Sequence, residues 1–151
     1  MILRRYTYLF LCICALGFIS CETGLQPINY NIEQCASCKM IISDKRFGAE
    51  LVTHKGKVYK YDATECLLRT LVENGLDKYE HIGINYFTAP GKLVDGRGAY
   101  FLVSKNIPSP MGGNLSAYPS HPEATKFKVE QGGDIFTFDE ILKEYTMVYG
   151  Q

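Results

Sequence analysis

Four sulfur-bearing residues have the types and the spacing that suit the binding of a soft metal ion. Cys35, Cys38 and Met40 lie close together in the chain, and Met111 follows in a separate stretch. Two cysteines three positions apart can bring both sulfur atoms to one point, and the adjacent Lys39 favours the thiolate form that binds metals. Thiolate and thioether donors select Cu(I) over the harder Mg²⁺, Ca²⁺ or Mn²⁺. Because zinc sites rarely use thioether, we interpret Cys35, Cys38, Met40 and Met111 as candidate Cu(I) ligands.

The two methionines would reach the ion in different ways. If the chain is extended from Cys38 to Ile42, side chains alternate, and Cys38 and Met40 point to the same face. Met111 follows two prolines and precedes two glycines, in a stretch without a helix or strand pattern. Such a stretch would hold Met111 out on a stiff loop. Composition alone leaves open whether Met111 is a ligand or fills a gap in the core.

Cys66 and the three histidines are weaker candidates. Cys66 falls in the first turn of a predicted helix, where the helix dipole favours a thiolate. It could be a third sulfur ligand, a disulfide partner or a buried small hydrophobe, and the sequence slightly favours the last. His54, His81 and His121 each suit a surface position, and His121 is the best placed because it follows Met111 after one predicted strand. We keep Cys66 and His121 as candidate additional ligands.

The first 20 residues have the features of an export signal. Two arginines precede an apolar stretch over residues 8–19. That stretch is short for a helix that must cross about 30 Å of hydrocarbon, but it suits a cleaved signal peptide. The run Phe18-Ile19-Ser20-Cys21 resembles the lipobox at which bacteria attach lipid to a cysteine, with phenylalanine where leucine is usual. The sequence therefore predicts a signal peptide over 1–20, lipid on Cys21, and a membrane-anchored protein that faces the periplasm.

The cysteine count also points to chemistry in the exported part. Of the six cysteines, two lie in the predicted signal peptide and Cys21 would carry the lipid, which leaves Cys35, Cys38 and Cys66. Three thiols cannot all pair within one chain, although export exposes them to an oxidising compartment. Either one disulfide leaves a free thiol, or the thiols are kept as metal ligands.

Composition and charge restrict the class of protein. The 151 residues include 46% hydrophobic ones, enough to bury the core of a single domain. The 16 basic and 16 acidic residues balance, and removal of the signal peptide would leave 14 basic against 16 acidic, a net charge of −2. Without an excess of positive charge we expect no binding to nucleic acid.

The spacing of apolar and turn residues predicts an α+β fold with two tandem ββα units. In the first unit, residues 50–54 and 58–61 alternate as strands around a Lys-Gly turn, and a helix follows that ends near Gly75. Asp62 and Glu65 fit the N-cap and third position of a capping box for that helix. The two units would form one domain over 35–151, joined to the lipid by a flexible tether over 21–34.

The second unit repeats the plan without repeating the residues. Strands are predicted over 100–103 and 115–118, followed by a helix that opens with a capping box at Ser120 and Glu123 and ends at 131–133. One strand over 81–88 lies between the two units. A last strand over 135–138 and a short helix over 139–145 complete the chain.

The chain resembles the NosL family, the accessory lipoproteins of nitrous oxide reductase assembly. The resemblance begins with Cys35-x-x-Cys38-x-Met40, followed by Ile42-Ser43-Asp44, and covers most of residues 35–142 in the same order. It continues through the segments 56–62, 109–118 and 131–141.

The resemblance implies a copper-binding lipoprotein with two small ββα units. Such a protein would deliver Cu(I) to apo nitrous oxide reductase or its membrane maturation complex. Carried onto this chain, the family pattern makes Cys38, Met40 and Met111 the first candidates as ligands, with Cys35 next. It also implies a carrier and not an enzyme.

Two other functions use the same residues. The first is a thiol-disulfide oxidoreductase outside the cytoplasm that uses Cys35 and Cys38. Such a motif normally opens a helix after a strand, whereas here an extended segment is expected to follow. The second is a structural zinc site built from the three cysteines and a histidine, which would leave both methionines without a role.

Overall fold

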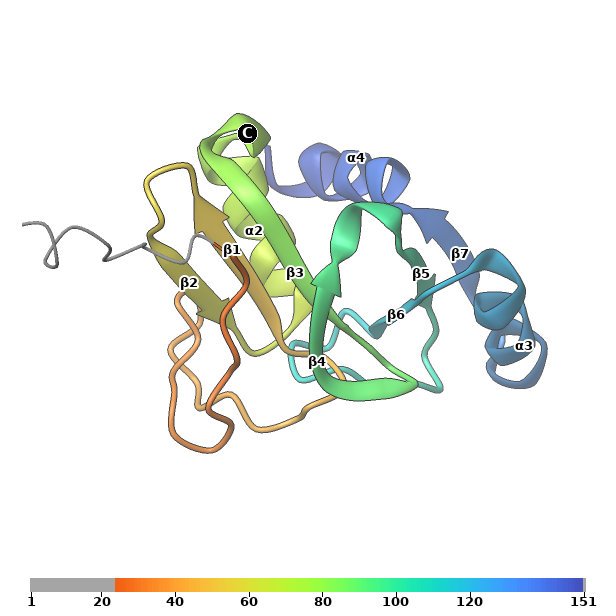
Figure 1. Ribbon diagram of the computed structural model, residues 1–151. Coiled ribbons are helices and arrows are strands. Elements are labelled where there is room, and N and C mark those ends of the chain that lie inside the picture. The colour runs from red at the N-terminus through yellow and green to blue at the C-terminus, as the bar shows by residue number, and fades with distance from the viewer. Residues whose placement is uncertain (1–23, 151) are drawn as a thin grey trace, which may run out of the picture.

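The first sheet is built around a hairpin that the sequence predicts well. The computed structural model describes residues 24–150. Strands β1 (Ala49–Thr53) and β2 (Val58–Tyr61) pair in antiparallel register, and Gly56 takes the positive φ of 76° that their connection needs. Strand β3 (Tyr79–Tyr86) pairs with the other side of β1, and β4 (Ala89–Asp95) pairs with β3. The strand order is therefore β2-β1-β3-β4 (Figure 1).

The second sheet has three antiparallel strands, and helices follow the strands of both sheets. Its central strand is β5 (Tyr100–Val103), which lies between β6 (Leu115–Tyr118) and β7 (Asp134–Thr137). The helices are α2 (Thr64–Asn74), α3 (His121–Gln131) and α4 (Phe138–Tyr149), with short 3-10 turns η1 (Leu76–Lys78) and η2 (Gly96–Gly98). The predicted α+β class and the two ββα units, β1-β2-α2 and β5-β6-α3, are confirmed.

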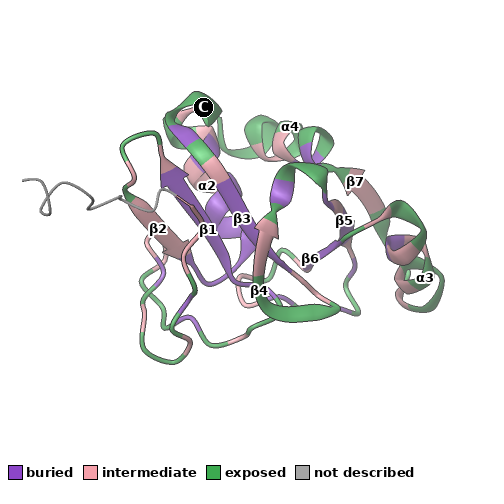
Figure 2. Ribbon diagram, viewed as in Figure 1, coloured by how far each residue is buried: buried purple, intermediate pink, exposed green. Residues whose placement is uncertain are grey.

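One apolar core joins the two sheets. Leu51 and Ile84 of the first sheet and Phe101 and Leu115 of the second belong to the same buried cluster. Figure 2 shows buried residues concentrated on β1, β3 and β5, while the outer turns of α3 and α4 are exposed. Because the core is shared, the chain packs as one unit and not as two independent ββα modules.

Strand β4 and the helix starts differ from the sequence prediction. No strand was predicted over Ala89–Asp95, where the structure forms β4 although Pro90 and Gly91 disfavour strands. Helix α2 has Ala63 at its N-cap and no side-chain cap, so the predicted Asp62–Glu65 capping box is absent. The Asp62 carboxylate instead accepts a hydrogen bond from the Ser43 N–H.

The capping of the two later helices differs from the prediction. Ser120 caps α3 as predicted, but the Glu123 carboxylate accepts a hydrogen bond from Thr88 instead of closing the box. A full capping box forms at α4, between Thr137 and Glu140. Since Thr137 is the N-cap, β7 ends one residue earlier and α4 begins one residue earlier than predicted, and the helix continues to Tyr149.

The segment before the cysteines packs on the domain. The Gln26 N–H donates to the buried Glu50 carboxylate at 2.7 Å, and Ile28 is 8% exposed. A Cβ at Gly83 of β3 would lie 2.7 Å from Leu25 Cδ2, so this segment lies directly on the sheet. We call residues 24–30 the N-terminal strap, which passes in front of the first sheet in Figure 1. The flexible tether predicted over 21–34 therefore does not include residues 24–34.

The predicted export and lipidation features lie outside the described residues. These are the signal peptide over 1–20 and Cys21. Within residues 24–150, no helix combines the length and the apolar character needed to cross a membrane.

Candidate metal centre

Cys35 and Cys38 lie in the tip of an irregular hairpin formed by residues 31–42. Backbone hydrogen bonds join its two arms, from Asn31 to Ile42 and from Cys35 to Met40, each at 2.8 Å. We call this segment the cysteine hairpin. Lys39 closes the tip through a 3.1 Å bond from its N–H to the Cys35 carbonyl and has a positive φ of 66°. The left-handed residue interrupts the extended alternation, so the strand geometry assumed for Cys38 to Ile42 is not formed.

The cysteine hairpin is held against the edge of the first sheet. The Ala36 N–H donates to the Lys60 carbonyl of β2 at 2.8 Å, directly after Cys35. From the same strand, the Lys60 ammonium pairs with Glu33 at 2.9 Å. These bonds fix the position of the cysteine-bearing turn beside the end of β2, where the chain leads into α2.

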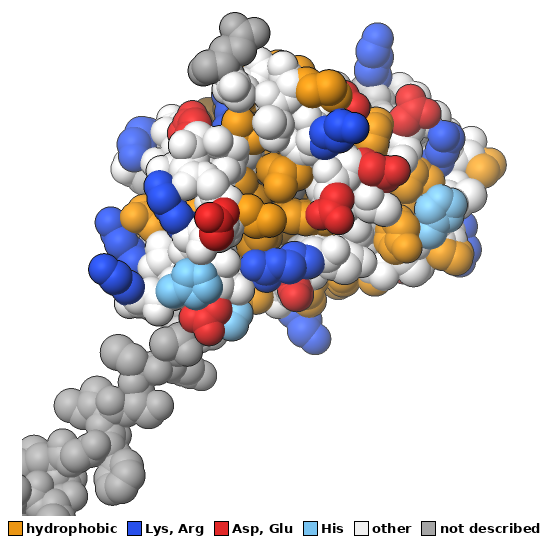
Figure 3. All heavy atoms as spheres, turned by 90° about the horizontal axis from the view of Figure 1, so that it is seen from above, with side chains coloured by type: hydrophobic (Ala, Val, Ile, Leu, Met, Phe, Trp, Pro, Cys, Tyr) orange, Lys and Arg blue, Asp and Glu red, His pale blue; other side chains and the backbone are white. Residues whose placement is uncertain are grey.

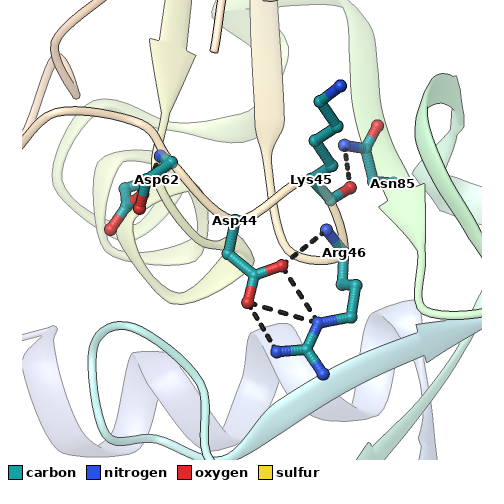
Figure 4. Close-up of polar contacts among 6 residues, drawn as sticks. Asp44, Lys45, Arg46, Asp62 and Asn85 are labelled. Carbon is teal, nitrogen blue, oxygen red and sulfur yellow. Dashed lines mark hydrogen bonds and ion pairs between the residues drawn. The ribbon is translucent and has the colours of Figure 1, made fainter. Parts of the chain in front are cut away.

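The connection that follows the cysteine hairpin is also fixed. Figure 4 shows Asp44 paired with the Arg46 guanidinium, at 2.6 Å, and the Asn85 amide donating to the Lys45 carbonyl, at 2.7 Å. The Ser43 N–H donates to Asp62 at 3.3 Å. Asp62 thus ties the segment after the cysteine hairpin to the start of α2, and it lies one position before the N-cap residue Ala63.

Cys66 joins the two hairpin cysteines in one cluster. The Sγ atoms of Cys35, Cys38 and Cys66 all lie within 4.8 Å of one another. Cys66 comes from the first turn of α2 and, like Cys35, is 1% exposed, whereas Cys38 is half-buried. All three thiols are free. Among the described residues, no other three His, Cys, Asp or Glu side chains gather so closely. Cys66 is thus buried in the core, as the sequence slightly favours, and its sulfur also lies beside two other thiols; its role as a ligand stays a prediction.

The cluster favours one shared thiolate. A hydrogen bond from the Cys66 thiol lowers the pKa of Cys35, and backbone hydrogen bonds from Asp62, Cys38 and Ser37 lower it further against the cost of burial. The same hydrogen bond raises the pKa of Cys66. Burial raises the pKa of Cys38. A negative sulfur surrounded by two more sulfurs is a site for a soft cation.

The two methionines lie on segments that adjoin the cluster. Met40 ends the turn that holds Cys35 and Cys38 and is 43% exposed. Met111 is half-buried and packs against the edges of the core. Its loop contacts Glu65, the residue before Cys66. The roles of Met40 and Met111 as ligands stay predictions, which the experiments below address.

The histidines lie apart from the cluster. His121 is exposed at the start of α3, where its ring packs edge-on against Tyr100 at 5.5 Å and Thr125 lies 3.3 Å from its Nδ1. His54 contacts the Asp77 carbonyl. The structure does not group His121 with the cysteines, and its role as an additional ligand stays a prediction.

Comparison with known proteins places these features in a family. The NosL family model matches residues 29–146. The copper-binding lipoprotein NosL of Stutzerimonas stutzeri is 27% identical over a 129-residue alignment, which covers 80% of this chain and 68% of that protein.

A solved structure has the same fold. The crystal structure of the copper chaperone NosL from Shewanella denitrificans superposes with a TM-score of 0.69 at 22% identity, covering 78% of this chain and 95% of that chain. The family match contains the cysteine hairpin, Cys66 and Met111, and it spans most of the folded domain. The chain belongs to the NosL family.

Proposed function

We propose that this protein is a non-catalytic carrier of Cu(I), anchored outside the cytoplasm by lipid on Cys21. Its cargo would pass to apo nitrous oxide reductase or to the membrane complex that matures this enzyme. The proposed ligands are Cys35, Cys38, Met40 and Met111. We include Cys66 with them, because its sulfur lies within 4.8 Å of the other two cysteine sulfurs. The relatives named as copper-binding and as a copper chaperone support the choice of metal.

One observation carries the proposal, namely the three free thiols whose sulfur atoms lie within 4.8 Å of one another. Thiolates bind Cu(I) strongly, and binding releases the protons that the thiols carry. The methionine thioethers add neutral soft donors, which hold Cu(I) without building up negative charge. Such a donor set suits a monovalent soft cation better than a structural zinc ion, whose sites rarely use methionine.

A carrier must also release its cargo, and the burial of the donors suggests where. Cys35 and Cys66 are almost fully buried, whereas Cys38 is half-buried and Met40 is 43% exposed. An acceptor protein would therefore exchange ligands first with Met40 and Cys38. The buried Cys35 and Cys66 would release the copper ion last.

The strap limits the distance between the domain and a membrane that a lipid on Cys21 would allow. The strap begins at Gly24, three residues after Cys21, a separation that an extended chain spans with at most about 11 Å. Gln26 lies beside Glu50 and Ile28 beside Gly48, so the strap follows β1. The cysteine hairpin lies nearby, because the Lys60 carbonyl accepts from the Ala36 N–H and the Lys60 ammonium donates to the Pro27 carbonyl of the strap. A lipid on Cys21 would therefore hold the domain close to the membrane.

A Cu(I) titration of the purified protein under reducing conditions, against a chelator of known affinity, tests the proposal. We expect one equivalent per chain, and loss of high-affinity binding in the double variant Cys38→Ser, Met111→Ala. Transfer of bound copper to apo nitrous oxide reductase, followed by its colour, tests delivery. Unchanged affinity in the double variant would discard the proposed ligands, and failure of transfer would discard the recipient.

Thiol-disulfide exchange is the other function that a specific observation favours, namely the lowered pKa of Cys35. The same protein, free of metal, should be assayed for insulin reduction. The carrier proposal predicts no turnover, because Cys35 and Cys66 are 1% exposed and a protein substrate cannot reach them. A catalytic rate that Cys35→Ser abolishes would favour the oxidoreductase instead.

A further inference from the structure

Glu65 is a buried carboxylate beside the cysteine cluster. It is the second residue of α2, directly before Cys66, and is 1% exposed. One carboxylate oxygen accepts a hydrogen bond from the Ser109 hydroxyl. The other oxygen has no hydrogen-bond partner among the described residues. Burying a carboxylate with one oxygen unpaired is costly, which makes Glu65 a candidate for a functional role.

Ser109 organises the loop that carries Met111. Its hydroxyl, besides donating to Glu65, accepts a hydrogen bond from the Asn114 N–H at 2.9 Å. Its carbonyl accepts from the Gly112 N–H at 3.0 Å. We call residues 108–114 the methionine loop. Ser109 therefore closes this loop on itself and attaches it to α2 through one side chain.

The backbone of the methionine loop also rests on Glu65. A Cβ built on Gly113 would lie 2.8 Å from Glu65 Cγ and 3.1 Å from the Tyr145 hydroxyl. Any side chain at position 113 would push the loop off the helix. The hydrogen bond and the close approach together place the methionine loop over the first turn of α2, where Cys66 contributes its sulfur.

We propose that Glu65 is a positioning residue that docks the methionine loop on α2 through Ser109 and so holds the Met111 thioether within reach of a cation bound by the cysteine cluster. This inference rests on the proposed Cu(I) carrier function. Glu65 touches neither the metal nor an acceptor protein. It acts through Met111, and this indirect action separates it from a residue that only stabilises the fold.

The test compares Ser109→Ala with Ser116→Ala in the full-length, detergent-solubilised protein. Ser116 is a matched control, because it is a buried serine with hydrogen bonds to the Leu102 carbonyl and the Tyr118 hydroxyl, away from the methionine loop. In a Cu(I) competition titration, Ser109→Ala should weaken binding by about tenfold, as the loss of a supporting residue typically does. Ser116→Ala should leave the affinity unchanged.

Two further variants test the carboxylate itself. Glu65→Gln keeps an oxygen that can accept from Ser109 and should bind Cu(I) like the wild type, whereas Glu65→Ala should match Ser109→Ala. Gly113→Ala leaves every hydrogen-bonding side chain in place but forces the loop away from Glu65. Gly113→Ala should weaken Cu(I) binding too. It provides the test of the inference if Ser109→Ala or Glu65→Ala fails to fold.

A double-mutant cycle shows whether the effect passes through Met111. In the Met111→Ala background, Ser109→Ala should cost no further affinity, since the thioether it positions is gone. Additive losses, or a neutral Ser109→Ala beside a weakened Met111→Ala, would overturn the inference and leave the carrier function intact. If the wild-type protein binds no Cu(I), the proposed function is overturned. If Met111→Ala leaves the Cu(I) affinity unchanged, Met111 is not part of the site and this inference fails with it.

Discussion

Cys66 acquires its chemistry from its neighbours in space. The pair Cys35 and Cys38 can be recognised from their spacing in the sequence. Cys66 lies 28 positions after Cys38 and reaches them only because Asp62 and the β2 edge bring the cysteine hairpin to the start of α2. The sequence alone cannot show that approach. It also could not show the contact between Glu65 and Ser109, which are 44 positions apart.

Alkylation of the thiols should follow their burial. A short pulse of iodoacetamide on the folded, metal-free protein should modify Cys38 first, while Cys35 and Cys66, each 1% exposed, should react only after unfolding. The lowered pKa of Cys35 does not overcome its lack of access. Peptide mass spectrometry measures the order, and urea-unfolded protein is the control. Labelling of Cys66 as fast as Cys38 would contradict the described burial. Loading with Cu(I) should protect Cys38 as well.

At the scale of elements, the strap and β1 share an unusual contact. Glu50 lies fully buried in β1 under the strap, where it accepts from the Gln26 N–H, and its second oxygen has no partner within the described part of the chain. Burial raises its pKa to about 7, although the Gln26 hydrogen bond and the Lys60 charge lower it. The folded protein therefore binds a proton at Glu50 more tightly than the unfolded chain does.

This binding should make stability depend on pH. With a pKa raised from 4.5 to about 7, Glu50 favours the folded state at low pH, and that contribution is lost as pH rises through this window. Glu50→Gln keeps the acceptor for Gln26 and removes the charge, so at pH 8 it should raise the free energy of unfolding by about 1–3 kcal/mol. Urea unfolding at pH 5 and pH 8 gives the comparison.

Glu33 provides a control of opposite sign. Burial would raise its pKa, but the hydrogen bond from Lys60 holds it below the usual value. Glu33→Gln should therefore destabilise the protein at pH 8, by less than about 1 kcal/mol for such a partly exposed pair. If the difference between wild type and Glu50→Gln did not change between pH 5 and pH 8, Glu50 would not be the buried acid described.

At the scale of the whole molecule, the sequence predicted the elements better than the boundary of the domain. Strands at 58–61, 100–103 and 115–118 matched, because alternation and turn residues mark them. The strap was mistaken for a tether, because its packing on Gly83 and Glu50 depends on β3 and β1 and leaves no periodic pattern. Strand β4 was not predicted, and it contains Pro90 and Gly91, which are unusual within strands.

The strap can be tested by truncation. A chain that begins at Gly24 should unfold at a higher urea concentration than one that begins at Cys35, since the shorter chain loses the cover that Leu25 and Ile28 give the first sheet. The loss should be about 2 kcal/mol or more, as for removal of a buried aliphatic side chain. If the two chains unfold with equal urea midpoints and equal slopes, residues 24–34 do not stabilise the domain and act as a tether.

The face of the molecule drawn in Figure 3 carries charges of both signs. In the face shown in Figure 3, Lys and Arg side chains lie among Asp and Glu side chains, with apolar side chains between them. Over the full chain the two signs balance at 16 each. With no excess of either sign, we expect long-range electrostatic attraction to contribute little to the binding of a partner.

Copper K-edge X-ray absorption of the Cu(I)-loaded protein tests the central claim most directly, that sulfur atoms from the cysteine hairpin, α2 and the methionine loop bind one ion. The account predicts a first shell made of sulfur alone in the wild type. It predicts that this shell loses one sulfur in Met111→Ala and keeps its composition in Ser116→Ala. A shell dominated by nitrogen or oxygen, or one that none of the cysteine or methionine substitutions changes, would contradict it.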